Sequence, residues 1–314
     1  MRIVFLDKDS LPVPCTPPRC ATAYVEYAHT RCDEVIARLG CATVAIINKV
    51  VLDAATLAQL PELRLIALAA TGHDCVDVDY CRNHGIAVSN VRDYAVHAVA
   101  EHVFALLLAL RRNLASYAAL VAEGAWQRSA QFCAHDAPLE DLHGSVLGIV
   151  GSGSIGRATA AIGTGFGMRV LHAASPSQPA GSAGRVELRE LLASADVLSL
   201  HCPLTAATRG LIGAAELGAM KRSAILINTA RGGLIDETAL VAALRDDRIA
   251  GAGLDVLSVE PPAAGNPLLE LRLPNFILTP HVAWASAGAM RTLAEELRAN
   301  IDSWAQGAPR NLVA

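Results

Sequence analysis

The chain has 314 residues, enough for two domains with separate hydrophobic cores. Its 53% hydrophobic and 4% aromatic content is typical of an α/β protein rich in alanine, valine and leucine. The net charge of −4 provides no basic surface, so neither nucleic acid nor an anionic membrane is expected as a partner. No apolar run reaches the ~20 residues that span a bilayer, and the charged first ten residues are typical of a first strand, not of a signal peptide.

Eight cysteines are scattered along the chain without a CxxC pair: Cys15, Cys20, Cys32, Cys41, Cys75, Cys81, Cys133 and Cys202. This spacing favours free thiols over a disulfide framework or a metal site. We therefore expect a cytoplasmic enzyme that binds no metal.

Strands and helices alternate through the first hundred residues. Strands are expected at 3–6, 24–27, 42–47, 63–68 and 86–89, and helices at 33–39 and at 53–60, where Asp53 is the expected cap. A proline-rich segment at 11–18 is expected to be a surface loop. The alternation predicts a small parallel, flavodoxin-like α/β domain.

A strongly apolar helix at 95–112 is expected to connect this domain to a second one, after which 123–142 is irregular. Further strands are expected at 146–150, 168–172, 197–200, 225–228, 251–256 and 276–279, with helices between them, notably 155–162 and 238–245. This predicts a doubly wound parallel sheet, so the chain should contain two Rossmann-like domains. The helical tail at 287–306 is expected to return to the first domain. The predicted domains are 1–97 with 286–314, and 98–285.

A glycine-rich turn follows the strand at 146–150. Its sequence is Gly-Ser-Gly-Ser-Ile-Gly, in which the first glycine permits a tight turn, the second a close approach of pyrophosphate, and the third close packing of helix on strand. Free amides at the helix N-terminus then attract phosphate. The predicted dinucleotide-binding residues here are Gly151, Gly153, Ser154, Ile155 and Gly156.

Three polar residues follow the ends of later strands: Arg231, Glu260 and His281. In an open α/β sheet, the carboxyl ends of the strands carry the ligand-binding and catalytic side chains. Each residue alone would more often be a solvated charge or a structural histidine, but their order after the glycine-rich turn indicates a catalytic set.

These motifs resemble the D-isomer-specific 2-hydroxyacid dehydrogenase family over nearly the whole chain. The resemblance includes Ala-Thr-Gly-His-Asp at 70–74 and Ala-Val-Ala-Glu-His at 98–102. The segments Trp-Gln-Arg-Ser-Ala-Gln-Phe at 126–132 and Pro-His-Val-Ala-Trp at 280–284 are most similar to its glycerate dehydrogenase (hydroxypyruvate reductase) branch.

The resemblance implies roles that the chemistry supports. Arg231 offers a planar guanidinium fork for the carboxylate and adjacent carbonyl of a 2-oxo acid. His281 can donate a proton to the forming alkoxide or accept it in the reverse direction. Glu260, if paired with His281, would stabilise the imidazolium form.

Further positions are implied by the family alone. Asp255 corresponds to the residue that holds the nicotinamide end of the cofactor. The cofactor-lining positions are Pro203, Thr229 and Ala230, and the substrate-binding positions are Thr71 and Gly72 together with Arg231 and His281.

The end of the second strand departs from the usual NAD pattern. NAD-specific folds place Asp or Glu there to bind the ribose hydroxyls, but Ala174 and Ser175 occupy this position, and the next acid is Glu187. No basic residue stands nearby unless Arg185 folds back. Binding of NAD(H) or NADP(H) is expected, and the choice between them stays open.

The sequence predicts an NAD(P)-dependent reductase of hydroxypyruvate or glyoxylate, working in either direction on a small 2-oxo or 2-hydroxy acid, and the family implies a homodimer. One alternative is a dehydrogenase for another 2-oxo acid, of the D-lactate type. Another is a non-enzymatic cofactor-sensing scaffold on the same fold, as in the C-terminal-binding corepressors. A phosphoglycerate dehydrogenase with a regulatory domain is disfavoured.

Overall fold

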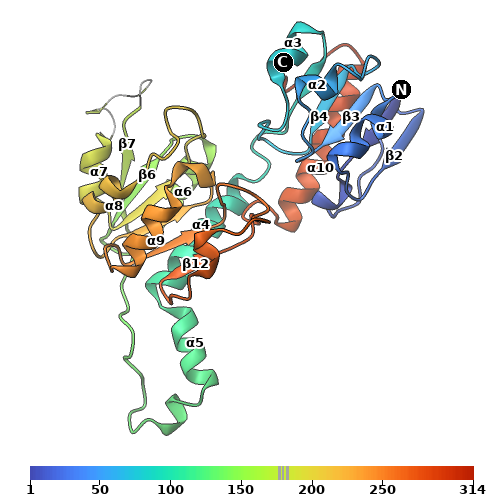
Figure 1. Cartoon of the computed structure of the whole chain (residues 1–314). Helices are drawn as coiled ribbons and strands as arrows, with labels where there is room; N and C mark the ends of the chain where they lie inside the picture. The colour runs from blue at the N-terminus through green and yellow to red at the C-terminus, as the bar shows by residue number, and fades with distance from the viewer. Residues whose placement is uncertain (176–177, 179, 182–183) are drawn as a thin grey trace. The chain divides into compact units, whose positions relative to one another are not determined.

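The structure is a computed structural model that describes residues 1–175, 178, 180–181 and 184–314. It contains two compact units, one formed by Met1–Ala95 with Ala285–Ala314 and the other by Val96–Trp284 (Figure 1). Each unit has a parallel sheet with helices, which confirms the predicted α/β class.

The first unit contains a five-stranded sheet. Its strands are β1 (Arg2–Phe5), β2 (Ala23–Glu26), β3 (Val44–Ile47), β4 (Leu65–Leu68) and β5 (Ala87–Ser89). Its helices are η1 (Lys8–Ser10), η2 (Cys32–Glu34), α1 (Val35–Leu39), α2 (Ala54–Leu57), α3 (Val78–Asn83) and α10 (Ala287–Ala305). The order β2-β1-β3-β4-β5, with every pair parallel, is that of flavodoxin-like sheets.

The elements expected in this unit are present, and their ends differ by a few residues. The strands β3 and β4 are buried at every position, which explains why the sequence shows them as continuous apolar runs rather than alternating ones. Asp53 caps α2 as expected, because its Oδ1 accepts a hydrogen bond from the Thr56 amide at 2.8 Å. The helix is shorter than predicted, and the proline at 61 disfavours helical backbone just before it.

The second unit contains a seven-stranded sheet. Its strands are β6 (Val146–Val150), β7 (Arg169–Ala173), β8 (Arg185–Val186), β9 (Val197–Leu200), β10 (Ile225–Asn228), β11 (Gly251–Leu254) and β12 (Phe276–Leu278). The order is β12-β11-β10-β9-β6-β7-β8, with all pairs parallel. From β8 to β11 this is the doubly wound order of dinucleotide-binding folds, and the strand order reverses between β6 and β9.

The helices of this unit are α4 (Val96–Arg111), α5 (Leu114–Ala122), η3 (Trp126–Arg128), α6 (Ser154–Gly165), α7 (Leu188–Ser194), α8 (Ala214–Ala219), η4 (Gly232–Leu234), α9 (Glu237–Arg245) and η5 (Pro267–Glu270). The apolar flank of α4 is buried in the core of the unit with residues of β6, β9 and β10. In the part of the chain described, no single helix is long and apolar enough to cross a membrane. Helices α4 and α5 would meet the length and hydropathy criteria together, but they are bent by 57°.

An arm formed by residues 113–141 projects from the second unit, with α5 along it (Figure 1). The sequence predicted irregular structure for its second half and no helix for its first. No residue of α5 is buried, and Phe132 is 87% exposed. The apolar residues of α5 are therefore not buried in a core among the described residues.

Two glycines of α6 differ in what surrounds them. A Cβ on Gly156 would lie 2.0 Å from the carbonyl oxygen of Gly151, whereas a Cβ on Gly165 would meet nothing within 4 Å. Gly156 thus allows the first turn of α6 to pack directly on the glycine-rich loop. The predicted close packing on the strand is also present, because the same Cβ would lie 3.3 Å from the Ile149 side chain of β6.

Gly156→Ala should lower the free energy of unfolding by about 1–3 kcal/mol, the usual cost of overpacking. Gly165→Ala in the same helix is the matched control, and it should be neutral or stabilising by up to about 1 kcal/mol because alanine favours helix. Urea unfolding followed by circular dichroism measures both. Equal stability of the two variants would show that Gly156 is not a packing requirement.

Candidate active site

The predicted catalytic residues follow three neighbouring strands. Arg231 follows β10, Glu260 lies in the segment after β11, and His281 lies beyond β12. These strands are adjacent and parallel, so their carboxyl ends meet at one edge of the sheet. The topology therefore places the three residues on one edge of the same unit.

His281 and Glu260 form a direct pair. Glu260 Oε2 lies 2.6 Å from His281 Nδ1, and Glu260 Oε1 accepts a hydrogen bond from the Leu257 amide at 2.8 Å. Their side chains are 28% and 30% exposed. With Nδ1 directed at the carboxylate, Nε2 is the nitrogen that can exchange a proton with a ligand.

His281 has an unusual backbone conformation, with φ of 56° in the left-handed region. The turn is held by Asp255, whose side chain is 1% exposed. Its carboxylate accepts hydrogen bonds from the Val282 amide at 3.0 Å and the Ala283 amide at 2.8 Å, and its backbone oxygen accepts one from the His281 amide at 2.8 Å. Such a conformation persists when surrounding contacts determine it. Asp255 therefore fixes the direction of the His281 ring.

Two partly buried residues outside the predicted site, Thr279 and His102, complete this network. The Thr279 hydroxyl donates to Asp255 Oδ1 at 2.5 Å, and His102 Nε2 of α4 lies 2.9 Å from the same hydroxyl and 3.6 Å from that carboxylate oxygen. His102 is the last residue of the family motif Ala-Val-Ala-Glu-His at 98–102, so the sequence did mark its position. Its contact with Thr279 is evident only in the fold.

The Arg231 segment is held by Asn228, another residue that sequence reasoning missed. Asn228 is fully buried, its Nδ2 donates to the Arg231 carbonyl at 2.9 Å, and its Oδ1 accepts from the Ala230 amide at 3.0 Å. The Arg231 Nη1 donates to the Ala230 carbonyl at 2.8 Å. The sequence offered one indication of this role, because Asn228 is the only polar residue of the otherwise apolar strand β10.

The segments after β10 and β11 pack directly on each other. A Cβ on Gly232 would lie 1.9 Å from the carbonyl carbon of Leu257, so only glycine allows this approach. Glu237 at the start of α9 adds support, because its carboxylate accepts bonds from the Ser258 amide and hydroxyl, both at 2.7 Å, and from Asn266 Nδ2 at 2.8 Å. These contacts hold the Arg231 and Glu260 segments together.

The glycine-rich loop fits a dinucleotide. Gly151 has φ of 102°, and a Cβ there would lie 2.5 Å from the Cys202 nitrogen, so the loop after β6 packs tightly on the segment after β9. A Cβ on Gly153 would meet nothing within 4 Å, which leaves its face open to a phosphate. Ser154 and Ile155 begin the twelve-residue helix α6, whose N-terminus points to the same edge.

The remaining predicted cofactor positions lie along this edge. Pro203 follows β9, Thr229 and Ala230 follow β10, and Ala174 and Ser175 follow β7. The Thr229 hydroxyl is buried and has no hydrogen-bond partner among the described residues, as expected of a group that a bound cofactor would satisfy. Burial lowers the pKa of His201, beside this loop, to about 4, so its imidazole is neutral near pH 7.

Thr71 and Gly72 belong to the first unit, in the segment after β4. The Thr71 hydroxyl donates to the Val91 carbonyl at 2.6 Å, and Asn90 Nδ2 donates to the Thr71 carbonyl at 2.7 Å. Asn300 of α10 donates to the Asn90 carbonyl at 2.8 Å. The returning C-terminal helix thus supports the Thr71 segment within its own unit.

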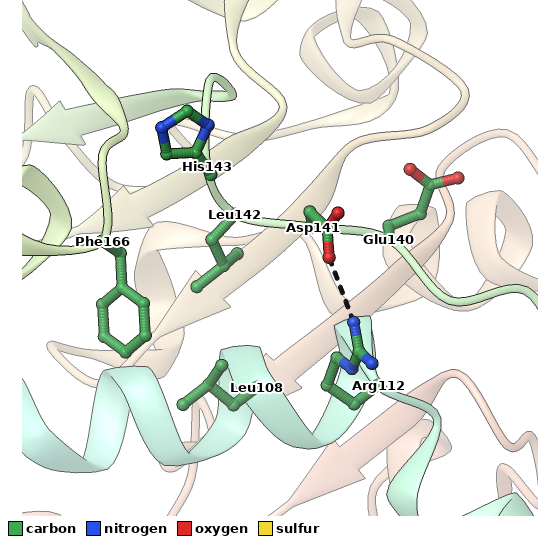
Figure 2. A pocket seen from close by; sticks show the side chains of 7 residues that line it. All are labelled: Leu108, Arg112, Glu140, Asp141, Leu142, His143 and Phe166. Carbon is green, nitrogen blue, oxygen red and sulfur yellow. Dashed lines mark hydrogen bonds and ion pairs between the residues drawn. The ribbon is translucent and has the colours of Figure 1, made fainter.

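A separate cavity of about 250 Å³ lies at the base of the arm (Figure 2). Its lining includes Phe166 at the C-terminal end of α6 and Leu142 just before β6, so it lies at the opposite edge of the sheet from His281. Arg112 and Asp141 bridge it with a contact of 3.1 Å. This cavity is distinct from the candidate active site. Among the described residues, no cluster of three or more His, Cys, Asp or Glu could hold a metal ion.

A doubly wound sheet with this phosphate loop, a histidine–glutamate pair and a neighbouring arginine defines a dinucleotide-dependent oxidoreductase. Residues 104–283 match the family model of the D-isomer specific 2-hydroxyacid dehydrogenase, NAD binding domain. The chain belongs to the D-isomer-specific 2-hydroxyacid dehydrogenase family, as its motifs predicted, and is an NAD(P)-dependent oxidoreductase of 2-hydroxy acids.

Individual relatives agree with this assignment. The chain is 48% identical to a glycerate dehydrogenase of Methylorubrum extorquens over 99% of its own length and 98% of the relative's. It is 37% identical to a hydroxypyruvate reductase of Blautia hydrogenotrophica, with 90% and 88% covered. The solved structure of an acyclic imino acid reductase in complex with NADPH and D-Arg has a TM-score of 0.85 and 30% identity, and all of both chains is covered.

Glu260→Gln should lower kcat in both directions by roughly 10- to 100-fold. The neutral amide keeps the size of the side chain but removes the charged acceptor that lies 2.6 Å from His281 Nδ1, so the histidine loses a charge-assisted hydrogen bond. Steady-state rates of oxo-acid reduction and hydroxy-acid oxidation measure this, with the exposed Glu270→Gln as control. An unchanged kcat would contradict the pairing.

Proposed function

We propose that this enzyme reduces hydroxypyruvate and glyoxylate to D-glycerate and glycolate, and oxidises the products in reverse. The observation that carries the proposal is the 2.6 Å contact between His281 Nδ1 and Glu260 Oε2, on the sheet edge that also carries Arg231. The names of the glycerate dehydrogenase and hydroxypyruvate reductase relatives support the choice of substrates.

The proposed roles follow from the chemistry of the side chains. Arg231 binds the substrate carboxylate and carbonyl through its planar fork. His281 delivers a proton from Nε2 to the carbonyl oxygen, and Glu260 stabilises the charged imidazole before that transfer. The bound NAD(P)H supplies the hydride. Asp255 acts at the nicotinamide end as a positioning residue, because its buried carboxylate holds the turn that carries His281.

The cofactor residues proposed are those of the glycine-rich loop and the strand ends: Gly151, Gly153, Ser154, Ile155, Gly156, Ala174, Ser175, Pro203, Thr229 and Ala230. Thr71 and Gly72 are proposed to contribute backbone amides to the substrate carboxylate. This assigns residues 1–97 with 286–314 to substrate binding and residues 98–285 to the dinucleotide.

Turnover with a panel of oxo acids tests the substrate assignment. Hydroxypyruvate or glyoxylate should give a higher kcat/KM than pyruvate or longer 2-oxo acids, with NADH and NADPH each used as donor. A higher kcat/KM for pyruvate would instead make the enzyme a lactate-type dehydrogenase.

His281→Gln should lower kcat by roughly 10²–10⁴, the usual contribution of a general acid. The amide keeps a hydrogen-bonding group of similar size but cannot deliver a proton. Cofactor affinity, measured by fluorescence titration, should stay close to that of the unaltered enzyme. Retention of most turnover at neutral pH would remove His281 from the mechanism.

We also propose that the enzyme is a cytoplasmic homodimer that associates through the arm of its second unit. All eight cysteines are free thiols, in keeping with a reducing compartment. The exposed apolar side chains of the arm include Leu114, Val121, Trp126 and Phe132. Apolar surface of this kind is typical of subunit contacts.

Val121→Asp with Phe132→Asp should shift the enzyme from dimer to monomer, because charges on this surface cannot be buried without a large cost. Leu269→Asp, an exposed apolar residue outside the arm, is the control and should leave the dimer intact. Sedimentation equilibrium gives the masses. A monomeric parent chain, or a dimer that survives both arm substitutions, would contradict this assembly.

A further inference from the structure

A polar cluster joins the glycine-rich loop to the end of β7. Its members are Ser152, His172 and Arg185, which are separated by up to 33 positions in the sequence. Arg185 Nη1 donates to Ser152 Oγ at 2.9 Å and to the Ala173 carbonyl at 3.3 Å. Ser152 Oγ lies 3.3 Å from His172 Nδ1. The guanidinium therefore lies beside the loop on which the cofactor phosphates bind.

The short strand β8 brings Arg185 to this position. It pairs in parallel with β7, so that His172 is opposite Arg185 and Ala173 is opposite Val186. No strand is predicted from the sequence at Arg185, so its position beside β7 became evident only from this pairing. The pairing directs Arg185 back toward the end of β7. A basic residue therefore does lie near Ala174, which the sequence alone left open.

The charged side chains that bond within or to this cluster, among the described residues, are arginines. Arg157 of α6 donates to the Ser152 carbonyl at 2.9 Å, which adds a second guanidinium. No aspartate or glutamate occurs in the sequence between Asp141 and Glu187. Burial, followed by the charge of Arg185, lowers the pKa of His172, so near neutral pH its imidazole is a neutral hydrogen-bonding group. In the described part of the chain, no hydrogen bond or ion pair joins a carboxylate to Ser152, His172 or Arg185, so the cluster suits an anion.

We infer that the enzyme selects NADP(H) over NAD(H), and that Arg185, with Ser152 and His172, binds the 2′-phosphate of the adenosine ribose. The inference deepens the proposed function, since it concerns the cofactor of the same reaction. In doubly wound folds the ribose lies at the end of the second strand, here β7, next to the phosphate loop. An NAD-specific fold has an acidic residue there, and this chain has Ala174, whose methyl group can neither accept a hydrogen bond from a ribose hydroxyl nor repel a phosphate.

Binding of cofactor fragments to the full chain, without any oxo acid, tests the inference. Isothermal titration should give an affinity for adenosine 2′,5′-bisphosphate at least about tenfold higher than for adenosine 3′,5′-bisphosphate, because the two carry similar charge but differ in its position. NADP⁺ should likewise bind more tightly than NAD⁺. Equal affinities within both pairs would overturn the inference, whatever the enzyme's oxo-acid substrate proves to be.

Substitutions then assign the preference to residues. Arg185→Gln should weaken binding of adenosine 2′,5′-bisphosphate and NADP⁺ by about 10- to 100-fold while leaving NAD⁺ within about threefold. Arg189→Gln, the same charge change at an exposed position of α7, should alter neither. Retained NAD⁺ binding shows that the variant is folded, and Ala174→Asp provides a second variant that should disfavour NADP⁺. A 2′-phosphate preference that persists in Arg185→Gln would show that Arg185 is not its source.

Discussion

The geometry of the active site depends on one buried carboxylate. Asp255 ends the strand β11, and its oxygens accept from the Thr279 hydroxyl and from the amides of Val282 and Ala283. These bonds hold the turn that carries His281 in a left-handed conformation, which a non-glycine residue rarely adopts alone. The direction of the His281 imidazole, the proposed proton donor, is thus determined by a group that is itself shielded from solvent.

The same edge of the sheet also carries the phosphate loop and Arg231, because all seven strands are parallel and their carboxyl ends lie together. The phosphate loop follows β6, the arginine follows β10, and the imidazole follows β12. Each function lies on a different connection, while close backbone contacts such as those at Gly151 and Gly232 fix the connections to one another. Rigid strands therefore position loops whose sequences are free to carry the chemistry.

The proposed selection of NADP(H) illustrates how an edge strand can add a group to this edge of the sheet. The two-residue strand β8 packs Val186 against the core, and its pairing with β7 places Arg185 beside the Ser152 hydroxyl. Two separate features of the sequence contribute here. No acidic residue stands at Ala174, and Arg185 follows eleven positions later. The pairing of the two strands brings them together in the proposed ribose subsite.

The sequence by itself determined the two α/β units, most strand positions, the role of Gly156 and the family, because these depend on local patterns and on motifs of fixed spacing. Through the resemblance to the family it also named Glu260 and His281 as members of one catalytic set, and it left their pairing conditional. It could not place Asn228, His102 or Arg185, since each acts through a partner that only strand pairing or helix packing brings near. Nor did periodicity reveal α5, an apolar helix with no buried residue. Only the tertiary structure decided these points, because a side chain's role depends on which group lies across from it, and that is a property of the packed chain.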